Sequence, residues 1–368
     1  MSISRFLTGR RIAAILLSAF ALAALLVAVK NDYGLYKSTI ARVTKAENSF
    51  DRNETGPGGQ VERHDTQALA LLIMNGPDAG KTATAKNAYA ESLVASEKYA
   101  AGDEVFVALT EDGGQLTAII TGEKRDVAIA LLAGLFVIGI LWVSRARGLL
   151  TVLSFLLNLS VFVLCMRLYM GGTPLVRLRF LMIGAFLVST LLLAGGLTRK
   201  AFGAILSSLV TLALTALLYH ATVALAGKPP YELMDYIFVP EDLEEIFLAG
   251  VLIGCLGAVM DVAITVCAAV SELVSASRPL TRREIVGAIR GIGHDIMGTM
   301  IAVLLFSYLS GSLPIIVVKV MNGYSFSSMA RFHVLFEIIR FLVGSIGIVL
   351  AIPVSGAVAV LLVGRRRS

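Results

Sequence analysis

Residues 250–273 read GVLIGCLGAVMDVAITVCAAVSEL, an apolar run longer than the roughly 20 residues that cross a bilayer as a helix. Its small and polar residues recur every three or four positions, which places them on one helical face. They are Gly250, Gly254, Gly257, Asp261, Thr265, Ala268 and Glu272. A stripe of small side chains predicts close helix packing, and an ionisable residue within it predicts a functional site.

The composition is that of a membrane protein. Of 368 residues, 57% are hydrophobic and 16% are charged, against about 25% charged in soluble domains. The net charge of +6 does not indicate nucleic acid, because no basic run is interleaved with aromatic residues. Cys165, Cys255 and Cys267 lie in apolar runs without metal-ligand spacing. We therefore expect no disulfide framework, no metal and no cofactor.

Eight apolar runs predict eight transmembrane helices. They cover residues 12–29, 127–143, 149–170, 180–197, 201–225, 246–273, 293–318 and 335–363. The first is predicted to be a retained anchor (residues 1–30), with a cleaved signal peptide as the alternative. A polar region (residues 31–125) and a seven-helix domain (residues 126–368) follow. The predicted fold class is an all-α polytopic membrane protein with a small β-rich extracytoplasmic N-terminal domain.

The loop charges predict the orientation of the helices. Basic residues gather before the first run, near residues 145–147, 199–200 and 278–290, and at residues 365–367, all on one side of the predicted membrane. Arg177 and Arg179, on the opposite side, are the one exception. The opposite side carries the polar region and an acidic loop at residues 232–245. Because basic loops stay in the cytoplasm, we expect a multipass protein of the cell membrane with both termini cytoplasmic.

The polar region predicts a small β domain. Residues 39–47 and 66–75 read as strands, and residues 104–120 as a hairpin turning at Asp112-Gly113-Gly114. Residues 50–65 read as a mobile polar loop. The segment GPDAGKT (residues 76–82) has three residues between its glycines where a phosphate-binding loop needs four. It is therefore predicted to be a turn between strands, and no nucleotide is expected as a partner.

Four ionisable residues are candidate transport or ion-binding positions: Asp261, Glu272, His294 and Asp295. Asp261 is predicted near the bilayer centre, as a proton or cation site or as a protonated packing partner. His294 and Asp295 are predicted to open the seventh helix, and Glu272 to form a salt bridge near them at the cytoplasmic mouth. Candidate packing glycines are Gly250, Gly254, Gly257 and Gly298. Glu337 and Arg340, one turn apart, are expected to pair locally.

Several segments resemble the YibE/F-like family of bacterial membrane proteins. In the helical region they are GCLGAVMDVAITV (254–266), GHDIMGTM (293–300) and SGSLPI (310–315); in the polar region they are NGPDAGKTATAKN (75–87) and YAAGDEVFVAL (99–109). The resemblance covers most of the chain. It implies a bacterial multipass membrane protein and points to transport without naming a substrate.

Three functions remain open. Asp261 and the helix-kinking Pro314 and Pro353 favour a permease or secondary transporter for an unknown small solute or ion, not an enzyme. The first alternative is an envelope scaffold that binds a partner through the exported domain. The second is an intramembrane aspartyl protease using Asp261 and Asp295. The protease is disfavoured because Asp295 is expected near the start of its helix, at a different membrane depth from Asp261, unless that helix begins near Thr281. The expected partner is the lipid bilayer, and a second copy of this chain or a protein of the cell envelope is a possible further partner that the sequence leaves open.

Overall fold

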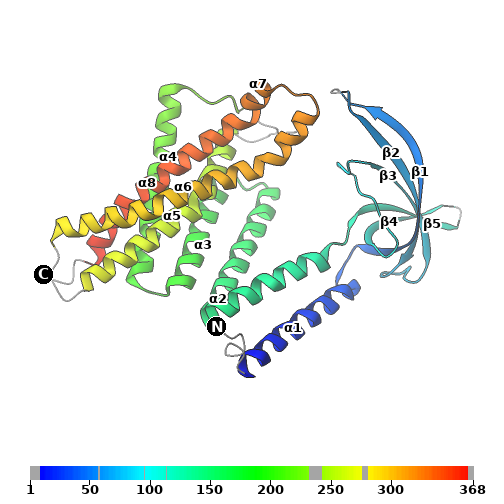
Figure 1. Cartoon of the computed structure of the whole chain (residues 1–368), viewed down its shortest axis with the longest axis horizontal. Coiled ribbons are helices and arrows are strands. Elements are labelled where there is room, and N and C mark those ends of the chain that lie inside the picture. The colour runs from blue at the N-terminus through cyan, green and yellow to red at the C-terminus, as the bar shows by residue number, and fades with distance from the viewer. Residues whose placement is uncertain are drawn as a thin grey trace, which may run out of the picture. The chain divides into compact units, whose positions relative to one another are not determined.

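The computed structural model describes residues 9–56, 59–94, 96–112, 114–231, 243–275 and 281–363. The chain divides into two compact units, Met1–Ser144 and Arg145–Ser368 (Figure 1). Each unit is described by itself. Part of the predicted charge pattern lies outside the described residues, namely Arg5, Glu232, Asp235, Glu241, Asp242, Arg278 and residues 365–367.

Long apolar helices make up most of the described chain. They are α1 (Gly9–Lys30), α2 (Asp126–Met170), α3 (Leu175–Gly195), α4 (Arg199–Ala226), α5 (Leu243–Ser275), α6 (Arg282–Met321) and α8 (Leu335–Val363), with the short α7 (Phe326–Met329) between the last two. Within the described residues, 8 segments are long and apolar enough to cross a membrane. The prediction of an all-α polytopic membrane protein with eight spans is confirmed.

Two of these spans lie in the single helix α2. They are Asp126–Arg145 and Arg147–Met170, and they meet at Arg145, whose backbone is not helical (φ 51°, ψ −129°). This left-handed φ is unusual for a residue with a side chain. The predicted basic connection therefore exists as a sharp kink and not as an extended loop.

The strands form a closed five-stranded barrel. They are β1 (Thr39–Thr55), β2 (Val61–Ile73), β3 (Thr82–Ala90), β4 (Glu104–Asp112) and β5 (Gln115–Glu123), in the order β1-β2-β3-β5-β4. All pairs are antiparallel except β3 with β5, where Thr84 pairs with Thr117. Alternate side chains such as Leu69, Leu71 and Ile73 fill the interior. The β-rich N-terminal domain is confirmed, as a Greek-key barrel of the kind seen in OB folds.

The predicted mobile loop at residues 50–65 is wrong. β1 and β2 run through it and pair as far as Thr55 with Val61, so it is an antiparallel arm that turns at about residues 56–60. Most of its side chains are exposed on both faces. Without a buried face the arm has no apolar alternation, which is the signal that a strand prediction needs.

The predicted turn at GPDAGKT is confirmed. Gly76 and Gly80 both have φ near +84°, a conformation that glycine adopts without steric cost, and Asp78 pairs with Lys81 at 2.8 Å. The strand β3 that follows was not predicted. Its inward residues include Ala83 and Ala85, which are too small to give a strong hydrophobic alternation.

A buried charge cluster joins the barrel to α1 and α2. The Lys124 side chain, only 2% exposed, donates to the Val29 carbonyl at 3.0 Å and lies 3.0 Å from Asp32 and 3.3 Å from Asp126. Burial alone would lower the pKa of Lys124, but the hydrogen bonds and negative charge of both aspartates raise it above its ordinary value. The folded unit therefore holds the ammonium charged, and the cluster fixes the ends of both helices to the barrel.

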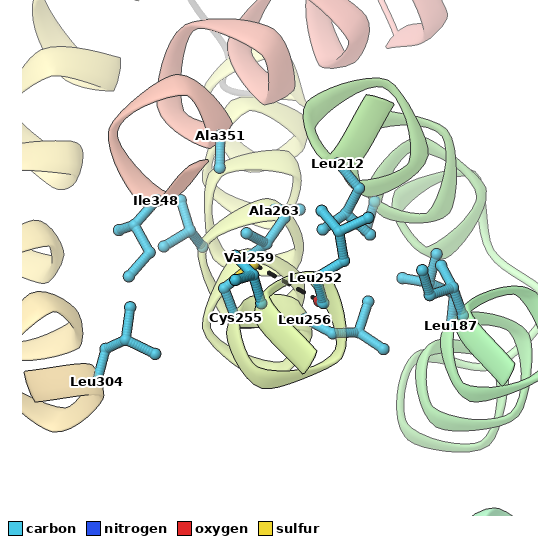
Figure 2. Close-up of a cluster of buried hydrophobic side chains, with 14 of the residues drawn as sticks. Leu187, Leu212, Leu252, Cys255, Leu256, Val259, Ala263, Leu304, Ile348 and Ala351 are labelled. Atoms are coloured by element: carbon cyan, nitrogen blue, oxygen red, sulfur yellow. Dashed lines mark hydrogen bonds between the residues drawn. The ribbon is translucent and has the colours of Figure 1, made fainter. Parts of the chain in front are cut away.

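Helix α5 forms the centre of the second unit. It packs against α3, α4, α6 and α8, and its residues dominate the largest buried cluster. Figure 2 shows Leu252, Cys255, Leu256, Val259 and Ala263 at the middle of this cluster, surrounded by side chains from the four neighbouring helices. Residues 250–273 therefore lie at the centre of the helical unit, as the sequence predicts.

Candidate functional site

The two faces of α5 have opposite roles. The face that carries Val251, Cys255, Val259 and Val262 is buried in the core. The opposite face carries the stripe of small and polar residues, of which Gly250, Gly254, Gly257 and Asp261 are exposed and Thr265 is partly exposed. Large side chains, and not the glycines, therefore make most of the helix contacts of α5.

Asp261 is an exposed carboxylate near the middle of an apolar helix. At about 1.5 Å per residue it lies roughly 27 Å from Leu243 and 21 Å from Ser275, the ends of α5. No ion pair or side-chain hydrogen bond reaches its carboxylate from the described residues. The Thr265 hydroxyl donates instead to the Asp261 backbone carbonyl at 2.7 Å. The carboxylate therefore has no side-chain partner within the described part of the chain.

A single close helix contact borders the stripe. A Cβ built at Gly254 would collide with the Tyr308 hydroxyl of α6. That hydroxyl is buried and has no hydrogen-bond partner among the described atoms. Gly254 and Asp261 are two turns apart on one face, about 10 Å along the axis. The stripe thus carries the unpaired Asp261 carboxylate, and the buried Tyr308 hydroxyl of α6 lies against the stripe two turns away, at Gly254.

The other three candidate packing glycines have no such neighbour. No described atom outside the helix backbone lies within 4 Å of a Cβ built at Gly250, Gly257 or Gly298. A close contact at these positions would have to come from another molecule, so their packing role stays a prediction.

The predicted position of His294 and Asp295 at the start of their helix is wrong. α6 begins at Arg282, with Thr281 as its N-cap and a capping box to Glu284. Asp295 lies about 20 Å from the start of α6, and Asp261 lies about 21 Å from the C-terminal end of α5, the helix that precedes α6 in the chain. The two aspartates therefore lie at similar distances from the connected ends of their helices. The depth argument against an aspartyl dyad therefore fails. Both His294 and Asp295 are exposed, and neither has an ion-pair partner among the described residues.

Glu272 lies apart from these residues. Its side chain is 78% exposed near the C-terminal end of α5, and its ion-pair partner is Lys200 of α4 at 3.7 Å. The expected salt bridge near His294 is therefore replaced by a loose surface pair, which contributes little to stability.

One ion pair at the other end of α5 was missed by the sequence analysis. Arg179 of α3, 7% exposed, pairs with Glu245 in the first turn of α5. In α8, Arg340 pairs with Glu337 at 2.7 Å, as predicted, and its guanidinium lies 5.2 Å from the centre of the Phe247 ring. The Arg179–Glu245 pair therefore links α3 to α5, and the contact of Arg340 with Phe247 links α8 to α5. Arg179 directly precedes the apolar run at residues 180–197, and its partner is 66 residues away in the sequence, so no local pattern indicated the pair.

Metal ligation has no support in the part of the chain that the structure describes. No group of three or more His, Cys, Asp or Glu side chains there is arranged to hold a metal ion. The three cysteines are buried and unpaired.

Two family models match this chain. One, described as YibE/F-like protein, matches residues 132–365, and the other, described as the YibE/F family N-terminal domain, matches residues 34–123. The matches together cover the barrel and nearly all of the helical region. No curated protein and no solved structure matches the chain.

Proposed function

Because the chain belongs to the YibE/F-like family of proteins, with eight apolar spans, we propose that it is a permease or secondary transporter in which Asp261 is the proton or cation site. The observation that carries this proposal is the isolation of Asp261. A carboxylate facing lipid at mid-membrane depth costs several kcal/mol, so such a residue belongs to a water-filled or protein-enclosed path.

The helices around Asp261 have features that favour a site whose access changes between the two sides of the membrane. The Tyr308 hydroxyl supplies a second polar group on the same side of α5. α6 and α8 contain Pro314 and Pro353, and each proline removes one backbone hydrogen bond from its helix. A π-helical segment, Ala330–Val334, precedes α8, and such segments occur often at functional sites. These irregular helices flank α5, whose buried face is densely packed.

The chemistry follows from the two states of one carboxylate. Ionised Asp261 attracts a proton or a monovalent cation, and either one neutralises the charge. The neutral site crosses an apolar barrier at far lower cost than the charged one. Movement of the flanking helices would then expose the loaded site to the opposite side.

A second candidate is an intramembrane aspartyl hydrolase. The similar depths of Asp261 and Asp295 favour it, since two carboxylates that share one water must lie at one level. His294 interrupts the Gly-x-Gly-Asp pattern of such enzymes. A hydrolase needs both aspartates and access to water, but it does not need to open to both sides of the membrane.

The transport proposal is tested by reconstituting the full chain in liposomes that contain a pH-sensitive dye. With a Na⁺ or K⁺ gradient imposed, the wild type should move protons. Asp261→Asn should abolish this flux, because the amide keeps the size of the side chain and cannot ionise, and Asp261→Glu should keep part of it. Asp51→Asn, an exposed barrel position, is the control. Equal flux in the wild type and Asp261→Asn would remove Asp261 from the mechanism.

A further inference from the structure

A groove between α6 and α8 is distinct from the α5 stripe. Its volume is about 930 Å³, within the range of roughly 300–1,000 Å³ typical of small-molecule sites. The lining consists of aliphatic residues, methionine, glycine and proline, with two polar exceptions, Arg290 and His294. Asp295, the next residue, does not line it. The groove thus combines an apolar surface with two nitrogen-bearing side chains.

The floor of the groove is built by two reciprocal contacts between α6 and α8. A Cβ at Gly293 would lie 2.6 Å from Ile352, and a Cβ at Gly356 would lie 2.8 Å from Ile289. Each helix therefore inserts an isoleucine against a glycine of the other. The backbones of α6 and α8 therefore meet closely beneath the groove.

Arg290 and His294 are one turn apart on the same face of α6. Both are exposed, and no described carboxylate pairs with either. Arg290 lies about 12 Å from the start of α6, a helix of 40 residues and hence about 60 Å, twice the roughly 30 Å hydrocarbon thickness. Arginine at this distance from a helix end reaches the headgroup level, and its guanidinium matches a phosphate with paired hydrogen bonds.

We propose that this groove binds an anionic phospholipid. The phosphate and acidic headgroup would lie against Arg290, and an acyl chain would lie along the apolar lining past His294 toward Met297 and Val349, deeper in the membrane. The charge of Arg290 and the apolar lining complement the two ends of such a lipid, and basic pockets between membrane helices bind anionic headgroups elsewhere. This inference does not depend on the proposed transport.

Native mass spectrometry of the full chain in mild detergent tests the proposal. The probe is an equimolar mixture of phosphatidylglycerol and phosphatidylcholine with identical acyl chains. The wild type should retain phosphatidylglycerol preferentially. Arg290→Gln should lower that retention at least about tenfold, since a hydrogen bond to a charged group contributes about 1.5–3 kcal/mol. Arg290→Lys should lose less, and Ala357→Trp, which fills the groove, should lose both lipids.

The control is Arg283→Gln, because Arg283 lies on the same helix, is exposed and does not line the groove. It should retain phosphatidylglycerol as the wild type does. Equal retention of the two lipids by the wild type, or unchanged retention by Arg290→Gln, would overturn the proposal. A lipid-free dimer that Ala357→Trp dissociates would also overturn it, by assigning the groove to a second copy of the chain.

Discussion

Arg179 and Asp261 are both ionisable side chains in apolar helices, but they differ in burial and in pairing. Arg179 is buried and paired with Glu245, so its charge is neutralised within the protein and stabilises the contact of α3 with α5. Asp261 has no such partner among the described residues, and its carboxylate faces out of the helix bundle. The first residue makes a structural contact, and the second is the proposed site.

Tyr36 allows a test of the cluster at the base of the barrel. Its hydroxyl donates to the Asp126 carboxylate, and this bond, with partial burial, raises the pKa of Tyr36 from 10.0 to about 12. A raised pKa means that folding favours the neutral phenol. The stabilisation is complete below pH 10.0 and is lost as the pH rises through about 12.

Alkaline spectrophotometric titration of tyrosine measures this pKa. The difference between the wild type and Tyr36→Phe should be one step near pH 12. In an Asp126→Asn background the step should move toward the ordinary value, because the largest cause of the shift is gone. A wild-type step already at the ordinary value would show that the phenol does not bind Asp126.

At the scale of helices and strands, long apolar runs were predictable and polar edges were not. Hydropathy located all eight spans, yet it placed the start of α6 at residue 293 because Arg283, Glu284 and Arg290 interrupt the apolar run. The sequence signal for the true start of α6 was the capping box Thr281-x-x-Glu284. The partner of Arg179 and the polar β1–β2 arm could not be predicted, because they depend on contacts between distant segments.

Two glycines of α5 form a matched pair for testing helix contacts. Gly254→Leu should destabilise the folded chain by about 1–3 kcal/mol, because the new side chain meets Tyr308 of α6. Gly257→Leu should be nearly silent in the monomer, since no described atom lies within 4 Å of the new Cβ. Thermal unfolding in detergent compares the two variants. Equal loss in both would mean that the Gly257 face is covered by another molecule.

At the scale of the whole molecule, the orientation in the membrane is still a prediction from loop charges. A reporter that is active only outside the cytoplasm should be active when fused after Ala101 or Gly227, and silent after Thr281. Activity in cells expressing each fusion, corrected for abundance, measures this directly. A silent fusion at Gly227 with an active one at Thr281 would invert the arrangement.

The central claim, that Asp261 is a transport site, is tested most directly by solvent access from both sides. Asp261→Cys would be treated with a membrane-impermeant thiol reagent in right-side-out and in inverted vesicles. The three native cysteines are buried and set the background, Val262→Cys is a buried control, and Leu217→Cys, at a position that is 65% exposed on an apolar helix surface, is a lipid-facing control. Alternating access predicts modification at position 261 in both vesicle orientations, with both controls unmodified. Modification in neither orientation, or in only one, would contradict it.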